Sequence, residues 1–439
     1  MTCRILTVQT AQEWPRVAQW LCNRGALGDG VEDAVRKILA EVREKGDEAL
    51  TEYTRRFDCA DFAPPLRVSG QDIARAAASV SVENREHISA AAANIRAFHE
   101  TQSEKSWFVT RPDGSILGQR VLPVDAAGLY VPGGQGGETP LVSSLLMSAI
   151  PAQTAGVTRL AVCTPPRKDG SVSPHILAAA HLLDIDEVYR VGGAWGIAAL
   201  AFGTQSIAAV DVIAGPGNIY VTTAKRMVQG TVGVDMIAGP SEILILADSS
   251  ANPAWIAADM LSQAEHDPLA SALCFTDNAN LGEAVRTELE SRCLALPRAQ
   301  TAARSLVDWG AVVIVPSLSV AVDIANSLAP EHLEICTRDP WAVMPRIRHA
   351  GAVFLGGHSP EAAGDYYAGP NHVLPTMGTA RYSSALSVQT FCKKTSIIAV
   401  SPDFLRQNAP AIAALARLEG LEAHARSVEA RTKSADESA

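Results

Sequence analysis

Short apolar runs that alternate with helical patterns dominate the middle of this chain. Between Val121 and Gly239 there are four such runs, and Pro or Gly closely follows each of them. They read Gly-Leu-Tyr-Val (128–131), Leu-Ala-Val-Cys (160–163), Glu-Val-Tyr-Arg-Val (187–191) and Val-Asp-Val-Ile-Ala (210–214). This strand–helix–strand rhythm predicts a parallel sheet that helices cover on both faces.

A second alternation of the same kind follows. Its predicted strands are Glu-Ile-Leu-Ile-Leu-Ala (242–247), Ala-Leu-Cys-Phe (272–275), Ala-Val-Val-Ile-Val (311–315) and Ala-Val-Phe-Leu (352–355). The chain contains no G-x-G-x-x-G and no Walker A motif. We therefore predict an α/β protein with two Rossmann-like parallel-sheet domains that lack the usual glycine fingerprint, together with helical N- and C-terminal extensions.

The flanks of the two blocks have helical periodicity. Apolar residues recur at the helical spacing from about Val31 to Ser103, and the chain looks helical again from Asp403 onward. We expect a peripheral N-terminal arm, two α/β domains and a C-terminal helical segment. Their predicted bounds are 1–25 for the arm, 26–128 with 242–385 for one α/β domain, 129–241 for the other, and 386–439 for the C-terminal segment.

Composition narrows the class of protein. The 439 residues suffice for roughly two to four domains. A net charge of −10 argues against nucleic acid or an anionic membrane as the partner. No run of eighteen apolar residues occurs, and the N-terminus has no secretory pattern. The eight cysteines are scattered without a C-x-x-C pair, so we expect reduced thiols and a cytoplasmic protein.

Gln263 and His266 are candidate metal ligands. They lie three residues apart at the end of a predicted helix whose apolar residues indicate that it packs inward. Buried polar side chains need partners, and imidazole is a common ligand of zinc. Two residues make an incomplete site, so other parts of the chain must supply the remaining ligands.

Three glycine-rich loops follow predicted strands of the first block. They are Val131–Glu138, Val191–Gly196 and Ala214–Asn218. Such loops at the carboxyl ends of parallel strands, before helix N-termini, suit a phosphate or nucleotide. For a single loop a tight turn without a ligand is the better interpretation. Three in one block favour a nucleotide.

Other polar groups have both a chemical and a structural interpretation. The pair Glu331-His332 lies at a helix–strand junction, where an acid and an imidazole could serve successive proton transfers. A solvated turn is the common alternative. The segment Gly364–Thr376 holds Asp365, Asn371 and His372; the alternative there is that Asp and Asn cap their own turns. His424, in the C-terminal helical region, would alone be an ordinary surface residue.

Taken together, the motifs resemble those of the histidinol dehydrogenase family over nearly the whole chain. The matching stretches are Gly-Leu-Tyr-Val-Pro-Gly-Gly, Gly-Pro-Gly-Asn, Asp-Met-Ile-Ala-Gly-Pro-Ser-Glu, Ser-Gln-Ala-Glu-His-Asp, Pro-Glu-His-Leu-Glu, Asn-His-Val-Leu-Pro-Thr and Glu-Gly-Leu-Glu-Ala-His-Ala. One such stretch would be weak support. All of them in order are specific.

The resemblance implies a zinc enzyme that oxidises L-histidinol to L-histidine with two NAD⁺, through an aldehyde-level intermediate. It implies a homodimer whose C-terminal segment crosses to the partner and completes the partner's site.

The implied zinc ligands are Gln263, His266, Asp365 and His424, and the implied catalytic residues are Glu331 and His332. The implied substrate contacts are Ser241, Gln263, His266, His332, Asp365, Glu419 and His424, with His372 close by. The implied NAD contacts are Tyr130, Asn218 and the position of Trp195. Histidinol offers an imidazole and an amine, both good zinc donors, so the metal would orient the carbinol.

Two features depart from the family pattern. Where members commonly have Gln, this chain has Trp195, whose indole could stack on the nicotinamide or ribose, or fill the pocket. The loop Gln135–Pro140 is longer and richer in glycine than usual, which could alter closure over the cofactor.

Two other functions compete with histidinol oxidation. A related dehydrogenase could act on another small alcohol, such as a sulfonated diol, but an acidic Glu419 suits a cationic substrate and would repel a sulfonate. A zinc-binding homologue could have lost catalysis, but the intact Glu331-His332 pair argues against that.

Overall fold

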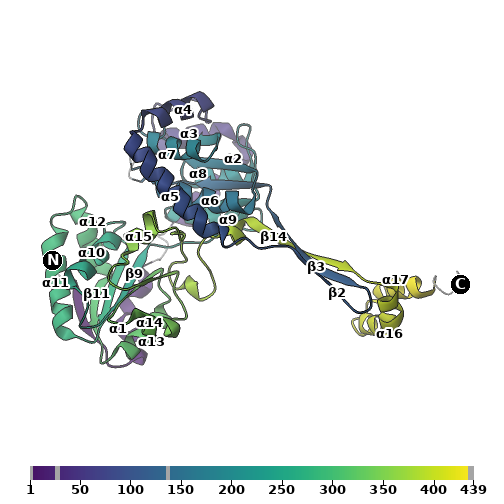
Figure 1. Cartoon of the computed structure of the whole chain (residues 1–439). Coiled ribbons are helices and arrows are strands. Elements are labelled where there is room, and N and C mark those ends of the chain that lie inside the picture. The colour runs from purple at the N-terminus through teal and green to yellow at the C-terminus, as the bar shows by residue number, and fades with distance from the viewer. Residues whose placement is uncertain (1–2, 25–29, 135–138, 434–439) are drawn as a thin grey trace. The chain divides into compact units, whose positions relative to one another are not determined.

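The computed structural model describes residues 3–24, 30–134 and 139–433 (Figure 1). The chain forms two compact units. Unit 1 comprises Met1–Gln102 and Val124–Phe391, and unit 2 comprises Ser103–Pro123 and Cys392–Ala439. Part of the unusual loop, Gln135 to Glu138, lies outside the described residues.

Unit 1 contains a five-stranded parallel sheet, sheet B, in the order β6-β5-β4-β7-β8. Its strands are β4 (Ala126–Tyr130), β5 (Arg159–Thr164), β6 (Glu187–Arg190), β7 (Val212–Ala214) and β8 (Gly233–Val234). The four strands predicted in the first block are confirmed. They read as apolar runs because helices bury both faces of the sheet.

Unit 1 also contains a six-stranded parallel sheet, sheet A, in the order β1-β11-β10-β9-β12-β13. Its strands are β1 (Arg4–Thr7), β9 (Glu242–Ala247), β10 (Ser271–Thr276), β11 (Gly310–Ile314), β12 (His332–Cys336) and β13 (Ala352–Leu355). Apart from β1, both sheets have the same order: third, second, first, fourth and fifth strand of the block. The prediction of two Rossmann-like sheets is confirmed.

The helices of residues 31–100 pack on sheet B. Two apolar clusters cover its two faces. The helices of residues 31–100 are α2 (Val31–Lys45), α3 (Asp47–Phe57), α4 (Gly70–Ser79) and α5 (Val82–Glu100). The other helices on this sheet are α6 (Val142–Ala155), α7 (Pro174–Leu182), α8 (Gly193–Phe202) and α9 (Ile219–Val228). This packing differs from the predicted grouping of 26–128 with 242–385. Helical periodicity shows that a helix has an apolar face, but not which sheet that face will cover.

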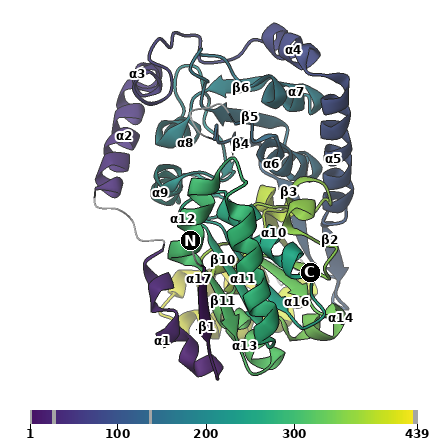
Figure 2. The same ribbon diagram turned by 90° about the vertical axis from the view of Figure 1, so that its left-hand side faces the viewer.

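Sheet A has its own helices. One face packs against α10 (Pro253–Ala264), α11 (Ala279–Cys293) and α12 (Ala299–Trp309), which Figure 2 shows from their outer side. The other face packs against α1 (Trp14–Val17) and α13 (Leu318–Leu328). Two short helices, α14 (Pro340–Val343) and α15 (Glu361–Tyr366), follow β12 and β13.

The N-terminal arm is not peripheral, contrary to the prediction. Strand β1 pairs with β11 at the edge of sheet A. The buried indole of Trp14 meets the ring of Phe275 edge-on, with the centroids 5.1 Å apart. An isolated strand of four residues carries too weak a pattern to be recognised before its partner strand is known.

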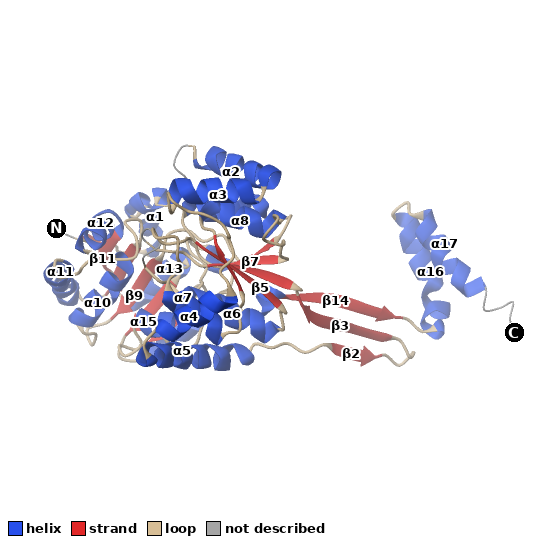
Figure 3. Cartoon of the chain, turned by 90° about the horizontal axis from the view of Figure 1, so that it is seen from above, coloured by secondary structure: helices blue, strands red, loops and turns tan. Residues whose placement is uncertain are grey.

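Unit 2 combines an antiparallel sheet with a helical hairpin. The order of sheet C is β14-β3-β2, from β2 (Trp107–Thr110), β3 (Ile116–Pro123) and β14 (Cys392–Ala399) (Figure 3). Helices α16 (Pro402–Leu418) and α17 (Glu422–Lys433) confirm the helical pattern predicted from Asp403. Strand β14 corrects the prediction of a wholly helical segment 386–439; it is mostly exposed on both faces, so its sequence lacks the usual alternation. Within the described residues, no helix is both long and apolar enough to cross a bilayer.

Candidate active site

The predicted catalytic pair lies at the amino end of sheet A. His332 is the first residue of β12, Glu242 is the first residue of β9, and the two strands are neighbours. Strand ends present backbone groups that the ladder leaves free. The N–H of Glu242 donates to Oε2 of Glu331 at 2.8 Å, and the carbonyl oxygen of Glu242 lies 3.2 Å from Nδ1 of His332. These contacts fix both side chains, which are 5% and 3% exposed. The alternative of a solvated turn is wrong.

Three carboxyl groups surround the imidazole of His332. Its Nδ1 lies 3.7 Å from Oε2 of Glu331 and 3.6 Å from Oε1 of Glu361, and its Nε2 lies 3.6 Å from Oδ1 of Asp365. Burial on its own would lower the pKa of His332, but the carboxylates of Glu361, Glu331 and Asp365 raise it to about 10. The site therefore has an excess of negative charge that favours a cation.

The carboxyl groups respond differently to the same burial. Burial raises the pKa of Glu331 to about 7 and that of Glu361 to about 8, against the lowering effect of His332. Burial would also raise the pKa of Asp365, but the close imidazole of His332 and its charge bring it below its usual value. Within one cluster, Asp365 is thus the carboxyl group that ionises most readily.

Helices α10 and α15 bring the candidate metal ligands together. One ligand atom each from His266, Glu361 and Asp365 can lie within 4.8 Å of one another. Gln263 is fully buried on α10, and neither atom of its amide group has a hydrogen-bond partner among the described residues. His266 lies two residues beyond the end of α10 and is exposed. His266 therefore reaches the cluster from a helix end, and the buried amide group of Gln263 lies on the same helix, less than one turn before it.

Sequence reasoning missed Glu361. It lies four residues before Asp365 on α15, so the two side chains share one helix face. That Glu-x-x-x-Asp spacing was the available signal, but charged pairs at this spacing are common on solvated helices. Only the structure shows that Glu361 is buried.

His372 lies in the loop that follows α15. Nε2 of His372 is buried without a hydrogen-bond partner among the described residues. Asn371 holds the loop: its Nδ2 donates to the carbonyl oxygen of Met147 at 2.6 Å, and its Oδ1 accepts from the N–H of Val373 at 2.9 Å. For Asn371 the structural interpretation, a residue that caps its own turn, is thus confirmed. Asp365 instead faces the cluster.

The donor set fits a resident metal ion. Buried atoms without protein partners include Nε2 of His332, Nε2 of His372, Oε2 of Glu361 and both amide atoms of Gln263. Buried polar atoms normally have partners, so such donors in a site with several carboxyl groups suit a cationic ligand. Nitrogen and oxygen donors of this kind suit zinc and neighbouring divalent metals.

Ser241, Glu419 and His424 complete the set of predicted site residues. Ser241 directly precedes β9, and its side chain hydrogen-bonds to Glu331. Glu419 and His424 are exposed in unit 2, where both line one groove between α16 and α17. The structure therefore brings Glu419 and His424 together with each other.

The predicted cofactor residues surround the carboxyl end of sheet B. Tyr130 ends β4, and Asn218 caps α9 directly after the neighbouring strand β7. The strand order reverses between β4 and β7, which is where open α/β sheets bind ligands. The hydroxyl of Tyr130 accepts from the N–H of Gly193 at 3.0 Å, which ties it to the second glycine-rich loop.

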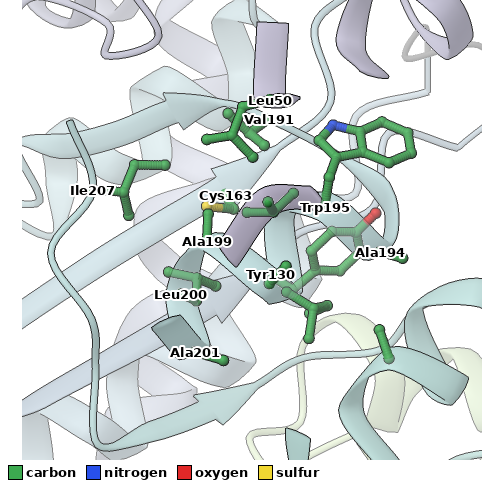
Figure 4. Packing of buried hydrophobic residues seen from close by; sticks show 14 of the residues in the cluster. Leu50, Tyr130, Cys163, Val191, Ala194, Trp195, Ala199, Leu200, Ala201 and Ile207 are labelled. Atoms are coloured by element: carbon green, nitrogen blue, oxygen red, sulfur yellow. The ribbon is translucent and has the colours of Figure 1, made fainter. Parts of the chain in front are cut away.

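Trp195 packs into unit 1. Its ring stacks against Tyr53 and Phe57 of α3, with centroid distances of 5.8 Å and 5.5 Å, and its Nε1 donates to Oγ1 of Thr54. Figure 4 shows the indole and Tyr130 among the buried residues of the same cluster. Of the two roles expected for this indole, filling the pocket is the one that these contacts support.

We expect Trp195→Ala to lower the free energy of unfolding by about 3–5 kcal/mol, because it removes a large buried ring from a packed stack. Trp195→Phe keeps an aromatic ring and should cost less. Urea denaturation of the three proteins measures the difference. A loss below about 1 kcal/mol for the alanine variant would contradict the packing role.

Comparisons with known proteins identify the family of this chain. The family model described as histidinol dehydrogenase matches residues 24–432. The chain is 65% identical over 432 residues to the histidinol dehydrogenase of Nitratidesulfovibrio vulgaris, covering 98% of this chain and 99% of that protein. It is 61% identical over 432 residues to that of Oleidesulfovibrio alaskensis, covering 98% and 100%. The crystal structure of histidinol dehydrogenase from Elizabethkingia anophelis matches with a TM-score of 0.93 at 36% identity, covering 99% of both chains. The chain belongs to the histidinol dehydrogenase family.

Proposed function

We propose that this chain carries out the zinc- and NAD-dependent, four-electron oxidation of L-histidinol to L-histidine through an aldehyde-level intermediate. Oxidation of histidinol in histidine biosynthesis follows from the family. The observation that carries the proposal in full is the convergence of unpartnered buried donors on His332 and its carboxylates.

Gln263, His266 and Asp365 would hold the zinc, with His424 of a second subunit as the fourth protein ligand. Glu361 reaches the same cluster and would accept a hydrogen bond there or join the ligands. When bound, the zinc supplies positive charge and a template for the imidazole and amine of histidinol. The three carboxyl groups around the single imidazole of His332 support this assignment.

His332 is the base for both oxidation steps. The carboxylates that raise the pKa of His332 would be countered by the charge of a bound metal ion, which would leave its Nε2 unprotonated and able to act as a base. In the first step, Nε2 takes the hydroxyl proton of histidinol while the hydrogen of the carbinol carbon leaves as hydride to the nicotinamide, which gives an aldehyde and NADH. Nε2 suits this role because it has no hydrogen-bond partner among the described residues, whereas Nδ1 lies against the carbonyl oxygen of Glu242. The hydrogen bond at Nδ1 fixes the orientation of the ring.

Glu331 activates water for the second oxidation. Its carboxylate takes a proton from a water molecule that adds to the aldehyde. The hydrate then loses a hydride to a second NAD⁺ and its remaining proton to give the carboxylate. Glu331 is held by the N–H of Glu242 and the side chain of Ser241, so it is positioned without occupying Nε2 of His332.

The nucleotide would lie at the carboxyl end of sheet B, in contact with Tyr130 and Asn218. The reversal of strand order there supports this placement without a glycine fingerprint. Oδ1 of Asn218 accepts from the N–H groups of Tyr220 and Val221, so the amide nitrogen is the part of this side chain left for the cofactor. Lys225 and Asp235 form a buried ion pair. Asp235 accepts the N–H of Gly215 and Lys225 donates to its carbonyl oxygen, so the pair fixes the loop that carries Asn218.

Two chains would form the dimer, each lending its Glu419 and His424 to the site of the other. Large apolar side chains are exposed on unit 2, among them Leu418 at 83% and Ile398 at 72%, as expected of a surface that a partner covers. The acidic Glu419 would then face the ammonium group of histidinol.

We place the enzyme in the cytoplasm, where the seven described cysteines, all free thiols, are stable.

Mixing two inactive variants tests the exchange. Subunits carrying His266→Ala and subunits carrying His424→Ala should each be inactive. Unfolded together and refolded as a mixture, they should regain about a quarter of wild-type activity, because half of the dimers then contain one intact site. If the mixture stays inactive, while wild-type protein recovers after the same treatment, both ligands serve the site of their own chain.

The pH dependence of the second step tests Glu331. Burial raises the pKa of Glu331 to about 7, and only its ionised form accepts a proton, so its contribution falls as the pH falls through this value. A bound cation moves the fall to lower pH. With the aldehyde as substrate, the ratio of the wild-type rate to the Glu331→Gln rate should decline toward acid pH. A constant ratio between about pH 5 and pH 9 would contradict the assignment.

Histidinol-dependent NADH formation tests the function itself. Zinc-loaded protein should reduce NAD⁺ with histidinol and form histidine. A sulfonated diol should not serve as substrate, because Glu419 and the carboxylates around His332 would repel it. Turnover of the diol without turnover of histidinol would favour the other dehydrogenase, and no turnover of either would favour a non-catalytic zinc protein.

A further inference from the structure

Two acidic residues, one buried and one half-buried, lie on the elements that carry the metal cluster. Glu334 is the third residue of β12 and only 1% exposed; Asp259 lies on α10, one turn before Gln263. Their carboxyl groups hydrogen-bond to each other. Neither residue takes part in the mechanism above.

Glu334 also forms a hydrogen bond with α15. Oε1 of Glu334 accepts the backbone N–H of Glu361 at 2.9 Å. Glu361 is the first residue of α15, and the preceding residue, Pro360, offers no side-chain cap. Helix N-termini leave their first N–H groups unsatisfied, so Glu334 caps this helix from a neighbouring strand.

These contacts join the three elements that supply the cluster. Asp259 belongs to the helix that carries Gln263, Glu334 to the strand that begins with His332, and Glu361 to the helix that carries Asp365. A chain of hydrogen bonds therefore runs from α10 through β12 to α15. Two carboxyl groups in hydrogen-bond contact share one proton, so one oxygen of the pair donates and the others accept.

We propose that Glu334 and Asp259 are positioning residues, which set the separation of α10 and α15 and thereby hold Gln263, His266 and Asp365 at metal-binding distance. This inference rests on the proposed zinc site. Groups that orient metal ligands typically contribute about 10–100-fold to metal affinity or activity.

Paired variants at position 334 separate positioning from packing. Glu334→Gln keeps an acceptor for the N–H of Glu361 and adds a donor to Asp259 at the same shape, so zinc affinity should stay close to that of the wild type. Glu334→Leu keeps the volume but removes both hydrogen bonds, and the zinc dissociation constant should rise about 10–100-fold. Chelator competition on the intact dimer measures both.

The visible absorption of bound cobalt gives a second measurement, which a change in protein stability alone would not alter. With Co²⁺ in place of zinc, the visible absorption of Glu334→Leu should differ from that of the wild type, whereas Glu334→Gln should reproduce the wild-type spectrum. Glu283→Leu is the matched control, because Glu283 is an exposed residue of α11; it should change neither the affinity nor the spectrum.

Asp259→Ala provides an independent variant. It removes the partner of Glu334 on α10 while leaving the cap on Glu361, and it should also weaken zinc binding; if Glu334→Leu does not fold, this variant decides. Unchanged zinc affinity in the folded variants would overturn the proposal, as would an equal loss in Glu334→Gln and Glu334→Leu. Wild-type protein that binds no zinc would instead refute the zinc site itself.

Discussion

His332→Asn is expected to lower kcat for histidinol oxidation by about 10²–10⁴-fold, which is the usual contribution of a positioned general base. Asparagine can still donate to the carbonyl oxygen of Glu242, as Nδ1 of the imidazole does, but it has no counterpart of Nε2. The variant thus removes the base and keeps the hydrogen bond to Glu242. Steady-state NADH formation at saturating histidinol and NAD⁺ measures the effect.

Zinc content and folding separate a lost base from a damaged site. His332→Asn should retain zinc, because the proposed ligands are other residues. His87→Asn, a change of the same type at an exposed position on α5, should leave kcat unaltered. If His332→Asn kept more than about a tenth of the wild-type kcat, His332 would not be the base.

His266→Ala is expected to weaken zinc binding by more than about 100-fold, since even changes to groups behind the ligands cost 10–100-fold. His266 is exposed beyond the end of α10, so its removal should disturb folding little. Activity at stoichiometric zinc should fall to background. Metal analysis after dialysis, followed by a histidinol assay, measures both effects.

The exposed His358 offers a control for His266. Its ring lies tilted against that of Trp255, with the centroids 5.2 Å apart, and His358→Ala should bind zinc and turn over histidinol as the wild type does. A His266→Ala protein with full zinc content would contradict the ligand assignment. Low zinc content with wild-type activity would show that the metal is not needed for the reaction.

The sequence predicted the fold well where both faces of a strand are buried. Strands such as β9 and β11 are continuous apolar runs, and both were recognised. Strand β12 was harder to recognise, because His332 and Glu334 interrupt it with polar residues that serve the site. The strands of sheet C were missed for the opposite reason: they are exposed, so no buried face imposes a pattern.

The site could be predicted only where its residues are neighbours in sequence. Gln263 and His266 share a helix end, and Glu331 and His332 are adjacent. Asp365, Glu419 and His424 came from the family resemblance, because no local pattern links them to α10. Glu361 and the acid pair on α10 and β12 depend on which helices meet beside β12, and tertiary packing alone determines that.

Zinc titration of metal-free protein tests the central claim most directly. The chain is stripped with a chelator, zinc is returned stepwise, and NADH and histidine are measured for a fixed amount of histidinol. Activity should rise in proportion to zinc up to about one ion per chain. Each histidinol should yield two NADH and one histidine, since each hydride carries two electrons. Full activity without zinc, or one NADH per histidinol with release of the aldehyde, would contradict the account.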